Sequence, residues 1–295
     1  MPRNYSTTSL ALIALLVLGI FGAPLSTEAE DDEGRWDFLP ERRPYAPYLA
    51  DPLRPAFGAS LLWYSDTEIP DTGDQRFGLK LGGLLPMVAW HPAEHLERPW
   101  TLSFAAGFNG QFDLDRDQDN VGWDGIYGVE LAHRLGPRWA VKVGSMHTSA
   151  HIGDEWAART GRERIDYTRE ELVGGVSWHP TRRWRLYGDL AWAYVRRTKE
   201  LQDPGRAQLG TEVYFPFPPG HAWESYVALD ANSYEERDWE VDLAAQAGVR
   251  QTEGPWRFAL SWASGRVPLG EFFFHDETYA SIGAWYDLGD WRTAD

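Results

Sequence analysis

The sequence predicts an all-β fold, an antiparallel transmembrane β-barrel of about twelve strands, and three observations support this fold class. Apolar and polar residues alternate with a period of two over long segments. The connections between these segments are alternately short and long, and tryptophans gather beside the short ones. These features are typical of strands that present one face to lipid and the other to a barrel interior.

The alternation is clearest over residues 100–112, a segment long enough to cross a bilayer as one tilted strand. One face carries Trp100, Leu102, Phe104, Ala106, Phe108 and Phe112, and the other carries Thr101, Ser103, Ala105, Gly107, Asn109 and Gln111. The same pattern later in the chain predicts that Val143 and Leu260 face lipid. A soluble β-sandwich rarely needs strands of this length.

The connections predict how the barrel is oriented. Short ones such as residues 136–138 contrast with long, charged ones such as 153–166. In outer-membrane barrels the short turns are periplasmic and the long loops external, so an even number of strands places both termini in the periplasm. Trp139 and Trp178 lie beside short turns. We interpret such tryptophans as an aromatic girdle at the membrane interface of a bacterial outer membrane.

The chain is expected to have three consecutive parts: a signal peptide over residues 1–29, a proline-rich segment over 30–56 and the barrel over 57–295. The apolar run of residues 10–22 is too short for a spanning helix, and the small residue Ala29 fits a cleavage site. Prolines cannot donate ladder hydrogen bonds, so we expect the second part to be a plug or an extended periplasmic segment that does not pair as a strand. A disordered periplasmic leader is the alternative.

Composition excludes several classes of protein. The absence of cysteine excludes disulfides and a lipidated anchor. The formal net charge of −16 argues against nucleic acid as a partner. No apolar run after residue 29 approaches the length of a spanning helix, which excludes a helical membrane protein. The expected partners are the lipids of the outer membrane, including lipopolysaccharide, and the oligomeric state stays open.

One group of residues suggests chemistry. By strict alternation, His147 and Ser149 lie on the outward face of one strand, about 6 to 7 Å apart at Cβ. Glu170 lies on the outward face of the next strand. Serine hydrolysis requires a histidine near the hydroxyl and a third group that orients the imidazole. The hypothesis is therefore that Ser149 is a nucleophile, His147 its base and Glu170 the orienting carboxylate.

Two resemblances bear on this hypothesis. His147-Thr148-Ser149 resembles the first three positions of the His-x-Ser-Asn motif that outer-membrane phospholipase A and the lipid A deacylases carry on the outer barrel wall, although Ala150 stands where those families have Asn. More of the chain, including residues 147–155, 166–171 and 187–188, resembles a family of uncharacterised bacterial outer-membrane β-barrels, the domain of unknown function 1207. That family implies a barrel and its location but no activity.

A second candidate site is a run of alternating carboxylates. Asp113, Asp115, Asp117 and Asp119 could bind Ca²⁺ or the cations that bridge lipopolysaccharide. The run lacks the glycine and the distal glutamate of a calcium loop, which favours a solvated acidic loop. No other cofactor is expected.

Three functional hypotheses follow. The leading one is a non-enzymatic outer-membrane barrel, either structural or a narrow pore. The second is an outer-membrane lipid esterase or deacylase that uses the Ser-His pair on the outer wall. The third is a secreted soluble β-protein that binds glycans through its tryptophans.

Overall fold

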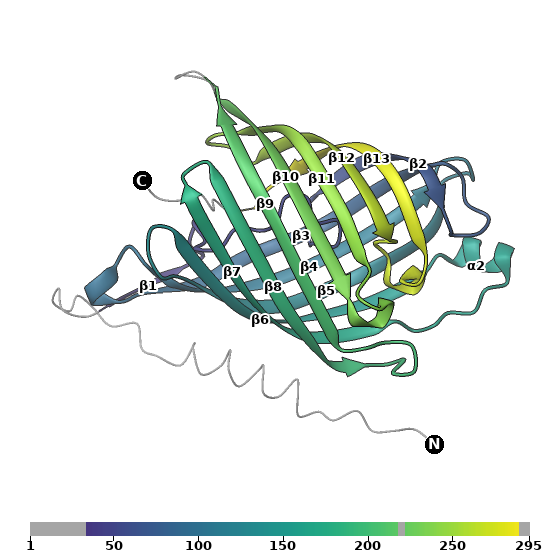
Figure 1. Ribbon diagram of the computed structural model, residues 1–295, viewed down its shortest axis with the longest axis horizontal. Coiled ribbons are helices and arrows are strands. Elements are labelled where there is room, and N and C mark those ends of the chain that lie inside the picture. The colour runs from purple at the N-terminus through teal and green to yellow at the C-terminus, as the bar shows by residue number, and fades with distance from the viewer. Residues whose placement is uncertain (1–33, 218–221, 289–295) are drawn as a thin grey trace. The chain divides into compact units, whose positions relative to one another are not determined.

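The computed structural model describes residues 34–217 and 222–288, so the signal peptide predicted for residues 1–29 lies outside the described residues. The described strands form one antiparallel sheet that closes on itself, because β3 pairs with both β2 and β4 and β13 pairs with β2 (Figure 1). None of the described helices has the length and apolar character needed to cross a membrane.

The barrel consists of the twelve strands β2 (Gly58–Thr67), β3 (Gln75–His91), β4 (Trp100–Asp113), β5 (Asp119–Arg134), β6 (Trp139–Ile152), β7 (Thr168–Thr181), β8 (Trp184–Arg196), β9 (Gly205–Pro216), β10 (Trp223–Tyr234), β11 (Val241–Gln251), β12 (Trp256–Arg266) and β13 (Asp276–Tyr286). Consecutive strands are hydrogen-bonded neighbours throughout. The predicted fold class and strand number are confirmed.

The two faces of the wall differ as the alternation predicts. On β4, Trp100 and Phe104 are exposed, whereas Thr101 and Ser103 are buried. Val143 and Leu260 are 54% and 63% exposed on the outside. An exterior of large apolar side chains suits lipid contact and is the reverse of what a soluble barrel presents to water.

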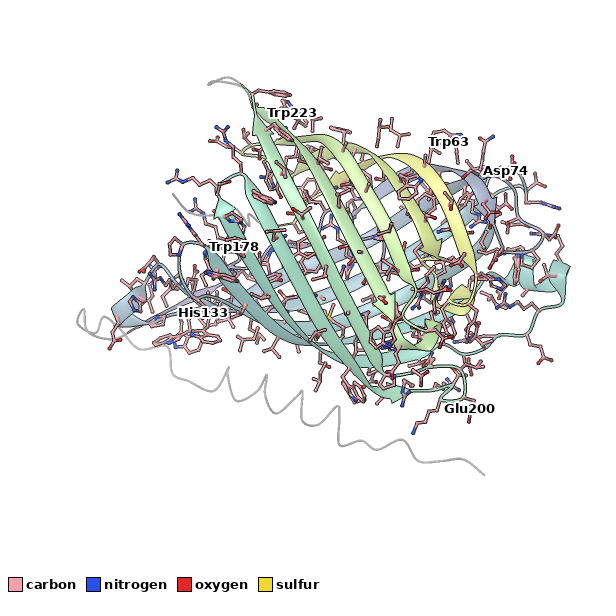
Figure 2. All side chains as sticks on the ribbon, in the orientation of Figure 1. Trp63, Asp74, His133, Trp178, Glu200 and Trp223 are labelled. Atoms are coloured by element: carbon pink, nitrogen blue, oxygen red, sulfur yellow. The ribbon has the colours of Figure 1, made fainter. Side chains whose placement is uncertain are left out.

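The two ends of the barrel also differ. In Figure 2, Trp178, Trp223 and His133 lie toward the end with the short turns, and Asp74 and Glu200 lie toward the other end, which carries the long loops. Trp178 stacks on Trp139 with 5.6 Å between the ring centroids. The tryptophans beside short turns thus form a rim of aromatic rings, as expected at a membrane interface.

The proline-rich segment begins with a short strand, β1 (Arg35–Phe38), which pairs with the end of β3 that extends beyond β2. The prediction that this segment does not pair as a strand is therefore wrong for β1. The physical reason is that the first proline of the segment is Pro40, so the residues before it keep their N–H donors.

Residues 43–56 then run through the barrel interior. Tyr48 stacks on Tyr187 of β8, with 3.7 Å between the ring centroids. Arg185 donates hydrogen bonds to the carbonyl oxygens of Ala46 (2.7 Å) and Pro47 (3.1 Å). Prolines bring no N–H into this space, so fewer backbone donors need buried partners.

The long-loop end is covered as well. These connections contain α2 (Asp154–Thr160), η2 (Glu235–Arg237) and η3 (Gly270–Phe272), while η1 (Ala93–His95) lies in a short connection. Trp156, Leu269 and Phe272 are buried in one cluster over this mouth. Glu271 is fully buried beneath it and accepts hydrogen bonds from the backbone N–H groups of Ile165 and Tyr167.

Candidate active site on the outer wall

The outward face of β6 turns from apolar to polar along its length. Val143 is followed on the same face by Ser145, His147 and Ser149. The strand register places Tyr127 of β5 opposite His147 on one side. The polar group therefore lies on the wall that faces lipid, in the half of the strand nearer the long loops.

On the other side of His147, the register places Glu170 of β7 directly opposite. Nδ1 of His147 lies 3.3 Å from Oε1 of Glu170. In the neutral tautomer that carries its hydrogen on Nδ1, this nitrogen donates to Glu170 and Nε2 is the basic nitrogen. The Tyr127 ring stacks on the imidazole at 4.3 Å, and the His147 side chain is 16% exposed. Two neighbours thus fix the orientation of the ring.

Ser149 lies on the same face two residues further along, opposite Thr168 of β7. Within the part of the chain that the structure describes, no hydrogen bond joins Ser149 to His147. The structure therefore brings His147 and Glu170 into contact and leaves the Ser149 hydroxyl nearby on the same face.

Ser145 is a residue that sequence reasoning missed. It lies two residues from His147 on the opposite side from Ser149, and its hydroxyl is hydrogen-bonded to the Tyr194 hydroxyl at 2.8 Å. The same spacing of two residues that singled out Ser149 would have found it. Any test of Ser149 needs Ser145 as its control.

Large apolar side chains surround this polar group. Leu172 lies opposite Ser145, and Trp192 lies opposite Leu172 on the next strand. Both are exposed. Ionisable residues within a lipid-facing belt are costly, and where they occur they commonly serve a function.

The backbone N–H of the residue after Ser149 is not available as a hydrogen-bond donor to an oxyanion. The backbone N–H of Ala150 donates to the carbonyl oxygen of Tyr167 at 3.0 Å. It is therefore not free to stabilise an oxyanion. The donors for a developing negative charge would have to come from outside the backbone of this strand.

Asp113, Asp115 and Asp119 of the acidic run have partners in the loops, and Asp117 adopts a left-handed backbone conformation with φ of 51°. Asp113 accepts hydrogen bonds from the N–H groups of Gly73 (2.8 Å) and Asp115 (3.0 Å). Asp115 accepts from the N–H of Gln75, and Asp119 pairs with Arg159. Over residues 34–217 and 222–288, no three acidic or histidine side chains gather in a way that could hold a metal ion.

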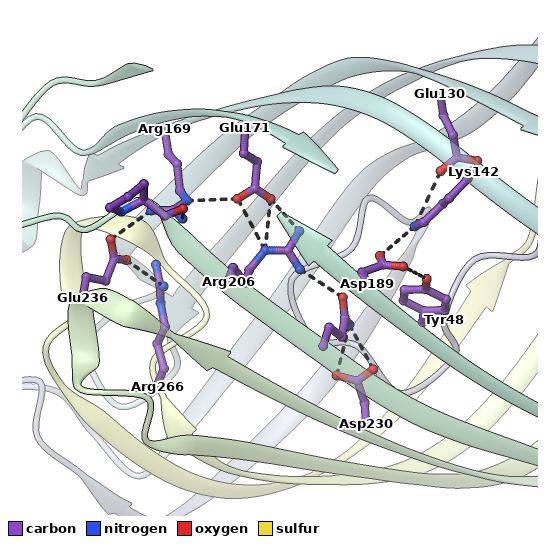
Figure 3. Close-up of polar contacts among 12 residues, drawn as sticks. Tyr48, Glu130, Lys142, Arg169, Glu171, Asp189, Arg206, Asp230, Glu236 and Arg266 are labelled. Atoms are coloured by element: carbon purple, nitrogen blue, oxygen red, sulfur yellow. Dashed lines mark hydrogen bonds and ion pairs between the residues drawn. The ribbon is translucent and has the colours of Figure 1, made fainter. Parts of the chain in front are cut away.

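The interior of the barrel is charged but filled. Lys142 lies 2.9 Å from Asp189, and Arg206 lies 2.6 Å from Glu171, within the network drawn in Figure 3. Together with residues 43–56, these side chains leave cavities of about 170 and 70 Å³. The paired charges and residues 43–56 thus narrow the lumen.

Comparisons with known proteins agree with this fold. The family model described as "Protein of unknown function (DUF1207)" matches residues 35–288. No curated protein matches the chain in sequence. Outer membrane phospholipase A from Escherichia coli is similar in structure, with a TM-score of 0.56 and 10% identity over 82% of this chain and 94% of that one. A Salmonella typhi outer membrane phospholipase dimer with bound calcium gives a TM-score of 0.58 and 10% identity, over 83% and 95%. At these identities the likeness shows the outer-membrane β-barrel fold alone.

Proposed function

The chain belongs to the family described as "Protein of unknown function (DUF1207)", and from its own geometry we propose that it is an outer-membrane enzyme that hydrolyses ester bonds of membrane lipids. Ser149 is the nucleophile, His147 the general base and Glu170 the group that orients His147. The observation that carries the proposal is the 3.3 Å contact between Nδ1 of His147 and Glu170, on the lipid-facing wall beside Ser149.

The proposed location rests on the exterior of the barrel. Its exposed apolar side chains and its rim of tryptophans suit an outer membrane with the short turns, and hence both termini, in the periplasm. This orientation places His147, Ser149 and Glu170 toward the outer leaflet. Ester-linked lipids of that leaflet, phospholipid or lipopolysaccharide, are the substrates within reach.

The chemistry follows the order of a serine hydrolase. The Ser149 oxygen attacks the ester carbonyl carbon while its proton passes to Nε2 of His147. The carbon–oxygen bond to the lipid alcohol then breaks, and the alcohol leaves with that proton. A water molecule, deprotonated by His147, releases the fatty acid and restores Ser149. Glu170 stabilises the imidazolium that forms between these steps.

The similar Salmonella typhi phospholipase contains bound calcium. Among residues 34–217 and 222–288 of the present chain, no three acidic or histidine side chains gather in a way that could hold a metal ion. No step of the proposed reaction is therefore assigned to calcium, and a chelator added to the assay tests whether hydrolysis requires it.

A second candidate function is a closed, non-enzymatic barrel. The observation that favours it is the filled lumen, which leaves separate cavities and gives no reason to expect a pore. Under this alternative, His147 and Glu170 only join β6 to β7. The two candidates differ in one measurable property, the release of fatty acid.

The experiment uses purified full-length protein in mixed micelles of phospholipid or lipid A. We expect fatty acid release that disappears in Ser149→Ala and nearly disappears in His147→Ala, with a smaller loss in Glu170→Ala, because the members of such a group act together. Ser145→Ala is the matched control and should keep the activity. Absence of release from the wild type, or equal activity in Ser149→Ala, would contradict the proposal.

A further inference from the structure

Two arginines lie at the rim of the barrel directly beyond Ser149. Nη2 of Arg164 donates to the carbonyl oxygen of Ala150 at 3.2 Å, so Arg164 contacts the residue that follows Ser149. The backbone N–H of Arg197 donates to the carbonyl oxygen of Thr168, the residue that pairs with Ser149. The side chain of Arg164 and the backbone of Arg197 thus lie at neighbouring points of the rim, and the two residues belong to different loops.

Asp166 holds these arginines as a pair. Its Oδ1 lies 2.9 Å from Nε of Arg164, and its Oδ2 lies 3.1 Å from Nη2 of Arg197. Asp166 adopts a left-handed backbone conformation with φ of 59°, which aspartate adopts more readily than most other residues.

Both guanidinium groups remain accessible. The side chains of Arg164 and Arg197 are 38% and 56% exposed. Glu271, 3.6 Å from Nε of Arg164, is the other nearby carboxylate, and it already accepts two backbone N–H groups. Asp166 contacts one nitrogen of each arginine, and Nη2 of Arg164 also donates to Ala150. Since a guanidinium carries five N–H donors, each arginine keeps further donors for a ligand.

The outer wall therefore has three zones in a fixed order. Apolar side chains such as Val143 come first, His147 and Ser149 follow, and Arg164 and Arg197 lie beyond them at the rim. A lipid that carries phosphate has the matching order of acyl chain, ester and phosphate, with only a few bonds between ester and phosphate. Adjacent positions on a strand are about 3.3 Å apart, so the last two zones lie within reach of one lipid molecule.

We propose that Arg164 and Arg197, positioned by Asp166, bind the phosphate group of an ester-linked lipid and so select phosphate-bearing lipids for this site. Guanidinium groups bind phosphate oxygens through paired, charge-assisted hydrogen bonds. Because Asp166 holds both side chains before the lipid arrives, less conformational freedom is lost on binding. The statement about selection rests on the proposed hydrolase, whereas the binding itself does not.

Binding is measured without hydrolysis by using full-length Ser149→Ala protein in detergent micelles. The probes are dihexanoyl phosphatidic acid, dihexanoylglycerol, which lacks the phosphate, and inorganic phosphate. We expect the phosphatidic acid to bind most tightly and its affinity to fall about tenfold for each arginine replaced in Arg164→Gln and Arg197→Gln. Arg116→Gln is the matched control, since Arg116 is also a half-exposed loop arginine paired with an aspartate, and it should leave binding unchanged.

Several results would overturn the proposal. These are equal binding of dihexanoylglycerol, unchanged affinity in both arginine variants, or binding of inorganic phosphate as tight as that of the lipid, which would indicate a phosphate site without a lipid. Arg197→Gln alone keeps the test valid if Arg164→Gln fails to fold, because Arg197 is the more exposed of the two.

The proposed function and this inference fail separately. Absence of phosphate-dependent binding together with normal fatty acid release would contradict the proposed phosphate site and leave the proposed hydrolase supported. Phosphate-dependent binding without any release of fatty acid by the wild type would support a lipid-binding site and contradict the proposed hydrolase.

Discussion

Replacing Leu260 by arginine tests whether the outer wall faces lipid. Leu260 is 63% exposed on β12, and its cross-strand neighbours Ala247 and Ile282 carry no charge that could pair with an arginine. It lies four residues from Trp256 at the aromatic rim, about 9 Å into the apolar belt for a strand tilted by roughly 45°. An arginine near the midplane of a barrel wall costs about 2 to 4 kcal/mol of folding free energy.

Unfolding in urea from lipid vesicles, followed by tryptophan fluorescence, measures this cost. Ser264→Arg is the matched control because Ser264 lies on the same face of the same strand, four residues nearer the long-loop end, where the cost should fall below about 1 kcal/mol. Equal losses at the two positions, or a loss below about 1 kcal/mol for Leu260→Arg, would refute the assignment of this face to lipid.

Three further predictions concern the interior, the loops and the orientation. Arg185→Met should destabilise the barrel by about 3 to 5 kcal/mol in the same urea assay, because buried Glu212 loses its partner, and should make residues 43–56 accessible to protease. Burial, and then the nearby Arg162, lower the pKa of His275 below its ordinary value of 6.5. Neutral His275 therefore stabilises its loop fully above about pH 6.5 and less as the pH falls. Acidification should lower the hydrogen-exchange protection factors of residues 267–275, which are corrected for the intrinsic pH dependence of exchange, in the wild type but not in His275→Gln. Tags inserted at Asp117 or Asp203 should be accessible on intact cells and a tag at Arg138 should not, and exposure at Arg138 would reverse the orientation.

Much of the fold could be predicted because strand alternation is a local property. The parity of each residue fixes its face, so the outward position of Leu260 and the inward position of Gln246 follow from counting along one strand. The hydrogen-bond partners of inward side chains do not follow from parity. Gln246 accepts a hydrogen bond from Arg257 and another from Tyr226, and these partners depend on register and on side-chain reach.

For the candidate site, too, some contacts could be predicted from the sequence and others could not. The contact of His147 with Glu170 could be anticipated because both residues face outward on neighbouring strands joined by one loop. The pairing of Arg164 with Arg197 through Asp166 could not, because it depends on the conformations of two long loops. A plug was one expectation for the proline-rich segment, but the path of residues 43–56 could not be predicted, since prolines exclude a central strand without specifying which contacts take its place.

The most direct test of the central claim is to trap the proposed nucleophile. A long-chain alkyl fluorophosphonate, which forms a covalent bond with an activated serine, is added to the full-length protein in micelles, and the modified peptide is identified by mass spectrometry. We expect a label on Ser149 that is absent in His147→Ala and weaker in Glu170→Ala. An unlabelled protein, a label on Ser145, or labelling of Ser149 that persists without His147 would contradict it.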